Sequence, residues 1–169
     1  LFAGCHSLKY VDLSNTNTIN NGSLQYVFNE CPKLKSIKLK NFRTDKVTIM
    51  TNMFNGCKSL KSLDVSSFNT ENVESMSSMF QNCELLTSLD LSNFDTKNVT
   101  VLNSMFYNCE NLRRVSIGNG IIQIHKDAFP DEMNVRKWIL APDSTDEAQC
   151  KMLLDVFGTS NLALSFLLG

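Results

Sequence analysis

The stretch Met53–Ser78, MFNGCKSLKSLDVSSFNTENVESMSS, is followed directly by Met79–Ser104, MFQNCELLTSLDLSNFDTKNVTVLNS. Thirteen of the 26 aligned positions are identical, far more than two unrelated segments share. Self-similarity at a fixed period is typical of repeat architectures, so one such copy is the unit of the fold. The chain is therefore predicted to be a solenoid.

The same period extends over five units, and two residue types hold the same place in every copy. The cysteine column is Cys5, Cys31, Cys57, Cys83 and Cys109, and the phenylalanine column is Phe2, Phe28, Phe54, Phe80 and Phe106. One copy cannot bury its apolar face alone. Stacked copies place like residues over like and so close a continuous core.

Each unit has two halves with different apolar spacing. The L-x-x-L-x-L run that ends at Val65 alternates, which predicts a short strand with one buried face. In residues 70–80 the apolar side chains recur at three and four, which predicts a short helix or 3₁₀ turn capped by Thr70 or Asn72. The predicted fold class is α/β: a right-handed leucine-rich-repeat solenoid with six parallel strands on one face and five helical or 3₁₀ returns on the convex side.

The wider pattern M-F-x-x-C-x-x-L-x-x-L-D-L-S-x-F-D-T-x-N-V resembles the BspA-like leucine-rich repeat family of microbial surface proteins. The match covers roughly residues 1–129 and is strongest in the two units quoted above. In the first unit Thr16 and Asn21 replace the Phe and Val of the motif, and Phe129 follows Phe106 after 23 residues instead of 26. That shorter unit resembles a second repeat type of the same family. The resemblance implies a cell-surface or secreted protein that contacts host proteins or other cells.

The solenoid is predicted to occupy residues 1–141, with a sixth strand in the sequence VRKWIL. Pro142 ends the pattern, and residues 142–169 are expected to form a C-terminal cap. The cap begins with a helix that ends at Gly158, and its last residues fit a strand, with a helix as the alternative. Because the chain starts inside a repeat, we expect it to be a fragment of a longer protein.

Charge and hydropathy exclude several classes of protein. A net charge of −1 argues against a nucleic-acid or anionic-membrane binder, since such binding uses many unopposed Lys and Arg side chains. No apolar run reaches the length that spans a membrane, so we expect no membrane insertion. Nothing at Leu1 resembles a secretion signal, and the extracellular or cell-surface location rests on the family resemblance. We expect a monomer.

The five column cysteines are predicted to be reduced and buried. Neighbouring strands in such a stack lie about 4.8 Å apart with parallel side chains, which suits a thiol ladder better than the twisted geometry of a disulfide. Disulfide pairing is the alternative. Cys150 lies outside the column, and we assign it no role.

Nothing in the sequence predicts catalysis, a cofactor or a metal site. His6 and His125 are several repeats apart in a linear stack, so they cannot share a metal ion or a catalytic triad. No nucleotide-binding glycine loop or zinc-protease motif is present, and the column cysteines have no base at a fixed repeat position. We predict that the protein is not an enzyme.

One column of basic residues beside the strands is the candidate binding site. Its members are Lys9, Lys35, Lys61, Arg113 and Arg136, with Thr87 interrupting it. Tyr10 and Arg114, at the two ends of the strand face, add the residue types that dominate protein interfaces. The column predicts a docking stripe for an acidic partner, such as a sulfated glycan or an acidic protein surface. The alternative is a solvated rim without a partner.

Three functional hypotheses follow. The first is a non-catalytic binding or adhesion module that recognises a protein or glycan on a host or neighbouring cell. The second is a structural scaffold or spacer that displays another domain. The third is an intracellular leucine-rich-repeat regulator, which unpaired cysteines suit equally well. Fold alone does not choose among them.

Overall fold

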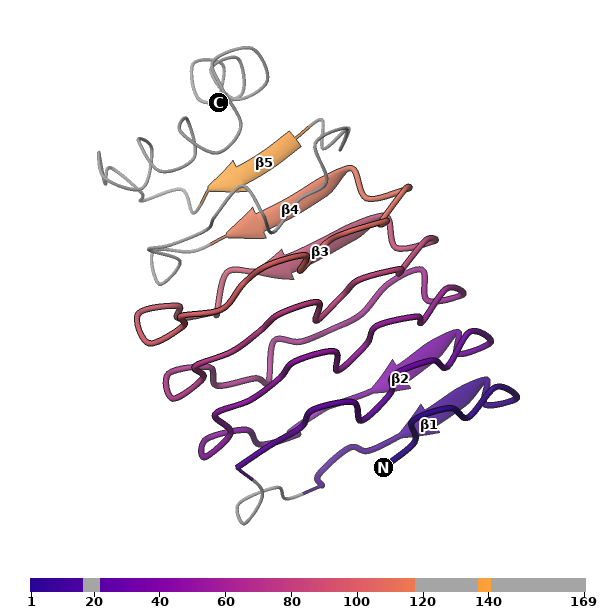
Figure 1. Ribbon diagram of the computed structural model, residues 1–169, viewed down its shortest axis with the longest axis horizontal. Helices are drawn as coiled ribbons and strands as arrows, with labels where there is room; N and C mark the ends of the chain where they lie inside the picture. The colour runs from indigo at the N-terminus through magenta and orange to yellow at the C-terminus, as the bar shows by residue number, and fades with distance from the viewer. Residues whose placement is uncertain (17–21, 118–136, 141–169) are drawn as a thin grey trace.

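The computed structural model describes residues 1–16, 22–117 and 137–140. Its coils stack in sequence order, so that each coil contacts the one before and the one after (Figure 1). The strands are β1 (Tyr10–Asp12), β2 (Ser36–Lys38), β3 (Ser88–Leu91), β4 (Arg114–Ile117) and β5 (Lys137–Leu140). They form two parallel sheets, β1–β2 and β3–β4–β5.

The strand register follows the predicted columns. Tyr10 pairs with Ser36 across β1 and β2, while Ser88 pairs with Arg114 and Arg114 with Lys137 across β3, β4 and β5. Paired residues are 26 positions apart between β1 and β2 and between β3 and β4, and 23 positions apart between β4 and β5. β5 lies inside the sequence VRKWIL, where the sixth strand was predicted.

The prediction of six strands is wrong in one coil. Residues 62–65 lie between the two sheets and form no strand. Leu63 and Val65 nevertheless keep their places in the core, with exposed fractions of 8% and 1%. Apolar packing therefore holds this coil in the stack without a strand ladder.

The predicted helical returns are also wrong, because the described residues contain turns in these places and no helix. Within the segment predicted as a helix, Ser78 has a φ of 54°, and Asn82, just beyond it, has a φ of 57°. These left-handed conformations are incompatible with a right-handed helix, which each of them would end. The apolar spacing of three and four therefore comes from successive tight turns.

The main-chain amides of the returns bond to the next coil instead of to their own. Three N–H groups donate to carbonyl oxygens of the following coil: Met76 to Val101 (2.9 Å), Ser78 to Asn103 (3.0 Å) and Phe80 to Met105 (3.0 Å). Between them, Met79 donates to Met76 within the coil at 3.2 Å, which closes a turn. Alternate amides thus close turns and join coils.

Two phenylalanine stacks run through the core. Neighbouring rings of Phe2, Phe28, Phe54, Phe80 and Phe106 have centroids 5.4, 5.6, 5.7 and 5.8 Å apart and lie within 9° of parallel. The second stack contains Phe42, Phe68 and Phe94, with centroids 5.8 and 6.5 Å apart. Apart from Phe2, all of these side chains are buried, so each coil adds a layer to one continuous core.

A column of buried threonines joins the coils through their side chains. The hydroxyl of Thr70 donates to the carbonyl oxygen of Asp95 at 2.9 Å and accepts the Asp95 N–H at 2.8 Å. Thr44 bonds to Asn69 in the same way, at 2.7 and 2.8 Å. Thr70, predicted as a helix cap, is therefore a clamp between two coils.

Some predictions concern residues that lie outside the described ones. They are the C-terminal cap at 142–169, together with Arg136, His125, Phe129 and Cys150.

We predict that Thr70→Val lowers the free energy of unfolding by about 1–3 kcal/mol, because it leaves the partly buried N–H and C=O of Asp95 without their Thr70 partner. Urea denaturation measures the change. Thr87→Val is the control, since Thr87 is exposed and its hydroxyl bond to the Lys61 carbonyl is long, at 3.5 Å. Equal effects of the two substitutions would contradict the clamp.

We also predict that Phe80→Ala costs about 3–5 kcal/mol, because it empties one layer of a close-packed stack. Tyr107→Ala removes an aromatic ring of similar size that is 49% exposed, and it should cost far less. Chemical denaturation of both variants makes the comparison. A neutral Phe80→Ala would show that the register is wrong.

Candidate binding surfaces

The structure places three of the predicted basic residues in one exposed column. Lys9, Lys35 and Lys61 hold equivalent positions just before the strand position of successive coils. The main-chain N–H of Lys35 donates to the Lys9 carbonyl oxygen at 2.8 Å, so these two residues lie directly above one another. Coil stacking thus brings the cations of the column within about 5 Å per step at the backbone.

The two ends of the column differ in how their cations are held. No ion pair involves Lys9, Lys35 or Lys61 among the described residues. Arg113, by contrast, donates from Nη1 to the carbonyl oxygens of Glu110 (2.6 Å) and Leu112 (3.2 Å). Its guanidinium is folded onto its own coil, so the three lysines are the better candidates for contact with a partner.

The predicted aromatic and arginine anchors lie at opposite ends of the strand face. Tyr10 on β1 is 65% exposed and follows Lys9 directly. Arg114 on β4 borders a shallow pocket of about 210 Å³ that Ser88, Asp90 and Ser116 also line. Tyr10 therefore adjoins the lysines of the basic column, whereas Arg114 adjoins Arg113, on the far side of the interruption at Thr87.

The aspartates next to the column have a structural role, because each accepts a hydrogen bond within its own turn. Oδ1 of Asp12, Asp64 and Asp90 accepts the N–H of Ser14, Ser66 and Ser92 at 2.9, 3.0 and 2.9 Å. The hydrogen bonds from Ser14 hold the pKa of Asp12 below its usual value. This D-x-S turn follows the strand position in these three coils, which explains the repeated aspartate without a reaction site.

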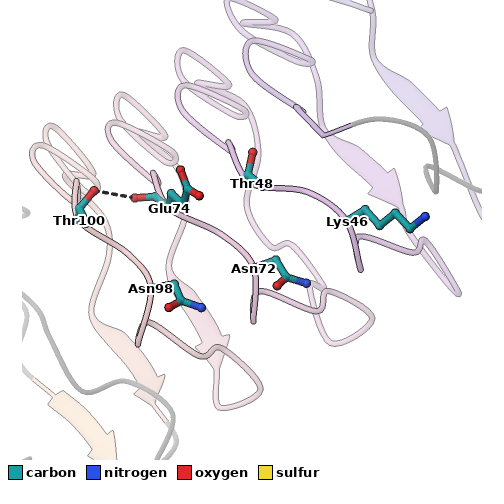
Figure 2. Close-up of a pocket in the computed structure, with 6 residues that line it drawn as sticks. All are labelled: Lys46, Thr48, Asn72, Glu74, Asn98 and Thr100. Carbon is teal, nitrogen blue, oxygen red and sulfur yellow. Dashed lines mark hydrogen bonds between the residues drawn. The ribbon is translucent and has the colours of Figure 1, made fainter.

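A polar groove crosses three successive coils at a different position from the basic column. It encloses about 670 Å³ and is lined by Lys46, Asn72 and Asn98 from one column and by Thr48, Glu74 and Thr100 from another. Figure 2 shows the two columns as parallel rows, one residue of each row per coil. This groove was not predicted from the sequence, because Asn72 was interpreted only as a possible helix cap.

The cysteine column lies inside the core as a ladder of thiols. Each Sγ donates to a phenylalanine carbonyl of the preceding coil: Cys31 to Phe2 (3.1 Å), Cys57 to Phe28 (3.3 Å), Cys83 to Phe54 (3.2 Å) and Cys109 to Phe80 (3.0 Å). Four of these five column cysteines are buried, Cys5 is half-buried, and all five are free thiols. Burial raises the pKa of Cys109 to about 12 and that of Cys83 well above its ordinary value. A neutral thiol is a poor nucleophile and a poor metal ligand.

Comparison with known proteins identifies the family. Residues 1–119 match the family described as "Mycoplasma protein of unknown function, DUF285". The chain belongs to the DUF285 family. The match covers about 70% of this chain, including the coils that carry Lys9, Lys35, Lys61 and the groove.

One solved structure aligns with this DUF285 chain at low identity. A solved structure of a leucine-rich cell surface protein from Faecalibacterium prausnitzii A2-165 aligns with 95% of this chain at 16% sequence identity and a TM-score of 0.37. The chain spans 65% of the length of that protein. No match was found among curated proteins.

In residues 1–16, 22–117 and 137–140, no three His, Cys, Asp or Glu side chains are grouped so that they could hold a metal ion. Within the same ranges there is no helix with the length and apolar character needed to cross a bilayer. His6 is exposed at the surface of the first coil.

The thiol ladder predicts how stability depends on pH. A buried thiol stays neutral in the folded state, whereas in the unfolded state it ionises near its ordinary pKa of 9.0. Its contribution to stability is therefore fully present below about pH 9 and is lost as the pH rises toward the folded-state pKa. Each such thiol adds at most about 1.4 kcal/mol per pH unit to that loss.

We therefore expect Cys83→Ala to lose stability less steeply than the native protein above about pH 9, and Cys83→Ala/Cys109→Ala less steeply again. Urea midpoints measured across this pH range give the slopes. Identical slopes for all three proteins would show that these thiols titrate alike in the folded and unfolded states.

Proposed function

We propose that this DUF285 protein is a non-catalytic binding module, secreted or displayed on a microbial cell surface. Its partner is an acidic protein or glycan on a host or neighbouring cell. The observation that supports the proposal is the column of Lys9, Lys35 and Lys61, three lysines that form no ion pair with any residue that the structure describes. The resemblance of the repeat motif to BspA-like surface proteins supports the location.

The lysine column has an energetic reason to attract an anion. Like charges one coil apart repel each other by about 1 kcal/mol or less in water, and the fold holds them in register through coil-to-coil bonds. An acidic partner with several charges would relieve this repulsion at all three positions together. Lys40, also exposed and without an ion pair among the described residues, adds a further cation on the same coil as Lys35.

Tyr10 gives the same surface a second kind of contact. Its ring is 65% exposed at the end of the column, next to Lys9. Tyrosine offers a large apolar face and a hydroxyl at small entropic cost, which is why it is common at protein interfaces. A partner that pairs with the lysines would cover this ring as well.

A scaffold or spacer is the second candidate. The middle of the strand face carries small polar side chains at Ser62, Ser66, Ser88 and Ser92. Such a surface has few of the residue types that supply binding energy, and it suits a rigid element that separates other domains. The two candidates differ in whether the described coils bind anything themselves.

We expect Lys35→Glu/Lys61→Glu to weaken binding to sulfated glycans or acidic extracellular proteins by about tenfold or more, and to reduce its dependence on salt. Surface plasmon resonance at low and physiological salt measures both effects. Lys33→Glu/Lys97→Glu is the matched control, because both side chains are exposed, lie outside the column and the groove, and change the net charge equally. Binding that is unchanged by the reversal would refute the basic column, and no binding by the folded protein would favour the scaffold.

A further inference from the structure

The polar groove is a second candidate binding surface, separate from the basic column. Its six lining residues flank the buried column of Val47, Val73 and Val99, one residue on each side of every valine. Because each valine side chain is buried, the side chains on either side of it line the groove as a pair, one pair per coil (Figure 2). We call these six lining side chains the rungs of the groove. Coil spacing sets the separation of the rungs at about 4.8 Å.

Hydrogen bonds to the backbone fix several of these rungs. Nδ2 of Asn72 donates to the Asp45 carbonyl oxygen at 2.8 Å, and Nδ2 of Asn98 donates to the Glu71 carbonyl oxygen at 2.8 Å. An amide side chain has two N–H donors and an oxygen acceptor, so each Asn retains groups for a ligand. Rungs held in this way lose little conformational entropy on binding.

The hydroxyls of the second row are held similarly. Thr48 Oγ1 donates to the Gly22 carbonyl oxygen at 3.1 Å and Thr100 Oγ1 to the Glu74 carbonyl oxygen at 3.3 Å. Once its proton is directed to the backbone, each hydroxyl presents lone pairs and accepts hydrogen bonds. The groove thus offers acceptors at fixed intervals.

Two charged residues interrupt the repeat inside the groove. Lys46 stands where the other coils have Asn72 and Asn98, and Glu74 stands between Thr48 and Thr100. Neither charged group forms an ion pair with any of the described residues. Repeat packing does not require them, because the Asn and Thr at the equivalent positions make the bonds to the adjacent coil.

The groove chemistry argues against most classes of ligand. It has no aromatic or apolar side chain for an amphipathic helix or a proline-rich peptide, and one Lys opposite one Glu does not clamp phosphates. An added peptide strand would need free backbone amides. Those of Thr48, Glu74 and Thr100 already donate to the preceding coil at 2.7, 2.8 and 2.9 Å.

We propose that the groove binds a linear, extended oligosaccharide whose rings lie one per coil. Successive rings of a β-1,4-linked glycan advance by about one coil spacing and face alternate ways, so each ring lies beside one pair of polar groups: Lys46 and Thr48, Asn72 and Glu74, or Asn98 and Thr100. Ring hydroxyls donate to the Glu74 carboxylate, the Thr hydroxyls and the Asn oxygens, and accept from Lys46. Three coils accommodate a trisaccharide.

The test is titration of the protein with cellotriose and chitotriose, followed by NMR shifts or calorimetry. Both should bind saturably, should retain binding at high salt and should bind more tightly than maltotriose, whose α-linkages curve the chain away from the rungs. Glu74→Ala should weaken binding by about tenfold, because a hydrogen bond to a charged group is lost. Glu110→Ala, which removes an exposed carboxylate outside the groove, should leave binding unchanged.

Urea denaturation of Glu74→Ala shows whether the variant keeps its fold, and Glu74→Gln, which keeps an acceptor, should weaken binding less. Failure of both extended trisaccharides to bind would overturn the proposal. So would binding that Glu74→Ala leaves intact. Binding that the Lys35→Glu/Lys61→Glu reversal abolishes would place the glycan on the basic column and would also overturn it.

Discussion

The hydrogen bonds between neighbouring coils determine where all other features of this protein lie. In the returns alternate amides donate forward, as Phe80 does to Met105, while at the start of the strands Lys35 donates back to Lys9. The left-handed residues, such as Ser78 and Asn82, turn the chain so that these amides point along the stack. Aligned in this way, the aromatic rings stack and the surface residues form columns.

Sequence columns predicted the strand register and the core, because a strict period places like residues over like whatever the local conformation. The same columns did not predict the turns. A spacing of three and four suits a helical face, but two consecutive tight turns produce it as well. The overlooked signal is the residue before the column cysteines, which has a positive φ in all five coils. It is Gly at positions 4 and 56 and Asn at 82 and 108, residues that tolerate the left-handed conformation, and Glu at 30.

The basic column and the polar groove also differ in how far the sequence predicts them. The column of Lys9, Lys35 and Lys61 was predictable, since register alone determines it. The conformation of Arg113 was not, because it depends on two carbonyl oxygens that the turn happens to present. Nor was the groove, since Asn72 and Asn98 become rungs only after the chain is known to turn there instead of forming a helix.

The thiol ladder makes the two faces of every coil different. Cys57 donates its S–H to the coil before, at the Phe28 carbonyl, while the Phe54 carbonyl of its own coil receives the S–H of Cys83. A coil therefore fits between its neighbours in one orientation only, with its thiol donor toward the preceding coil and its carbonyl acceptor toward the following coil. Duplication of one 26-residue segment would lengthen such a chain without creating a new kind of interface. Each added coil would extend every surface column by one residue. The length of a binding column and the types of residue in it can therefore change separately.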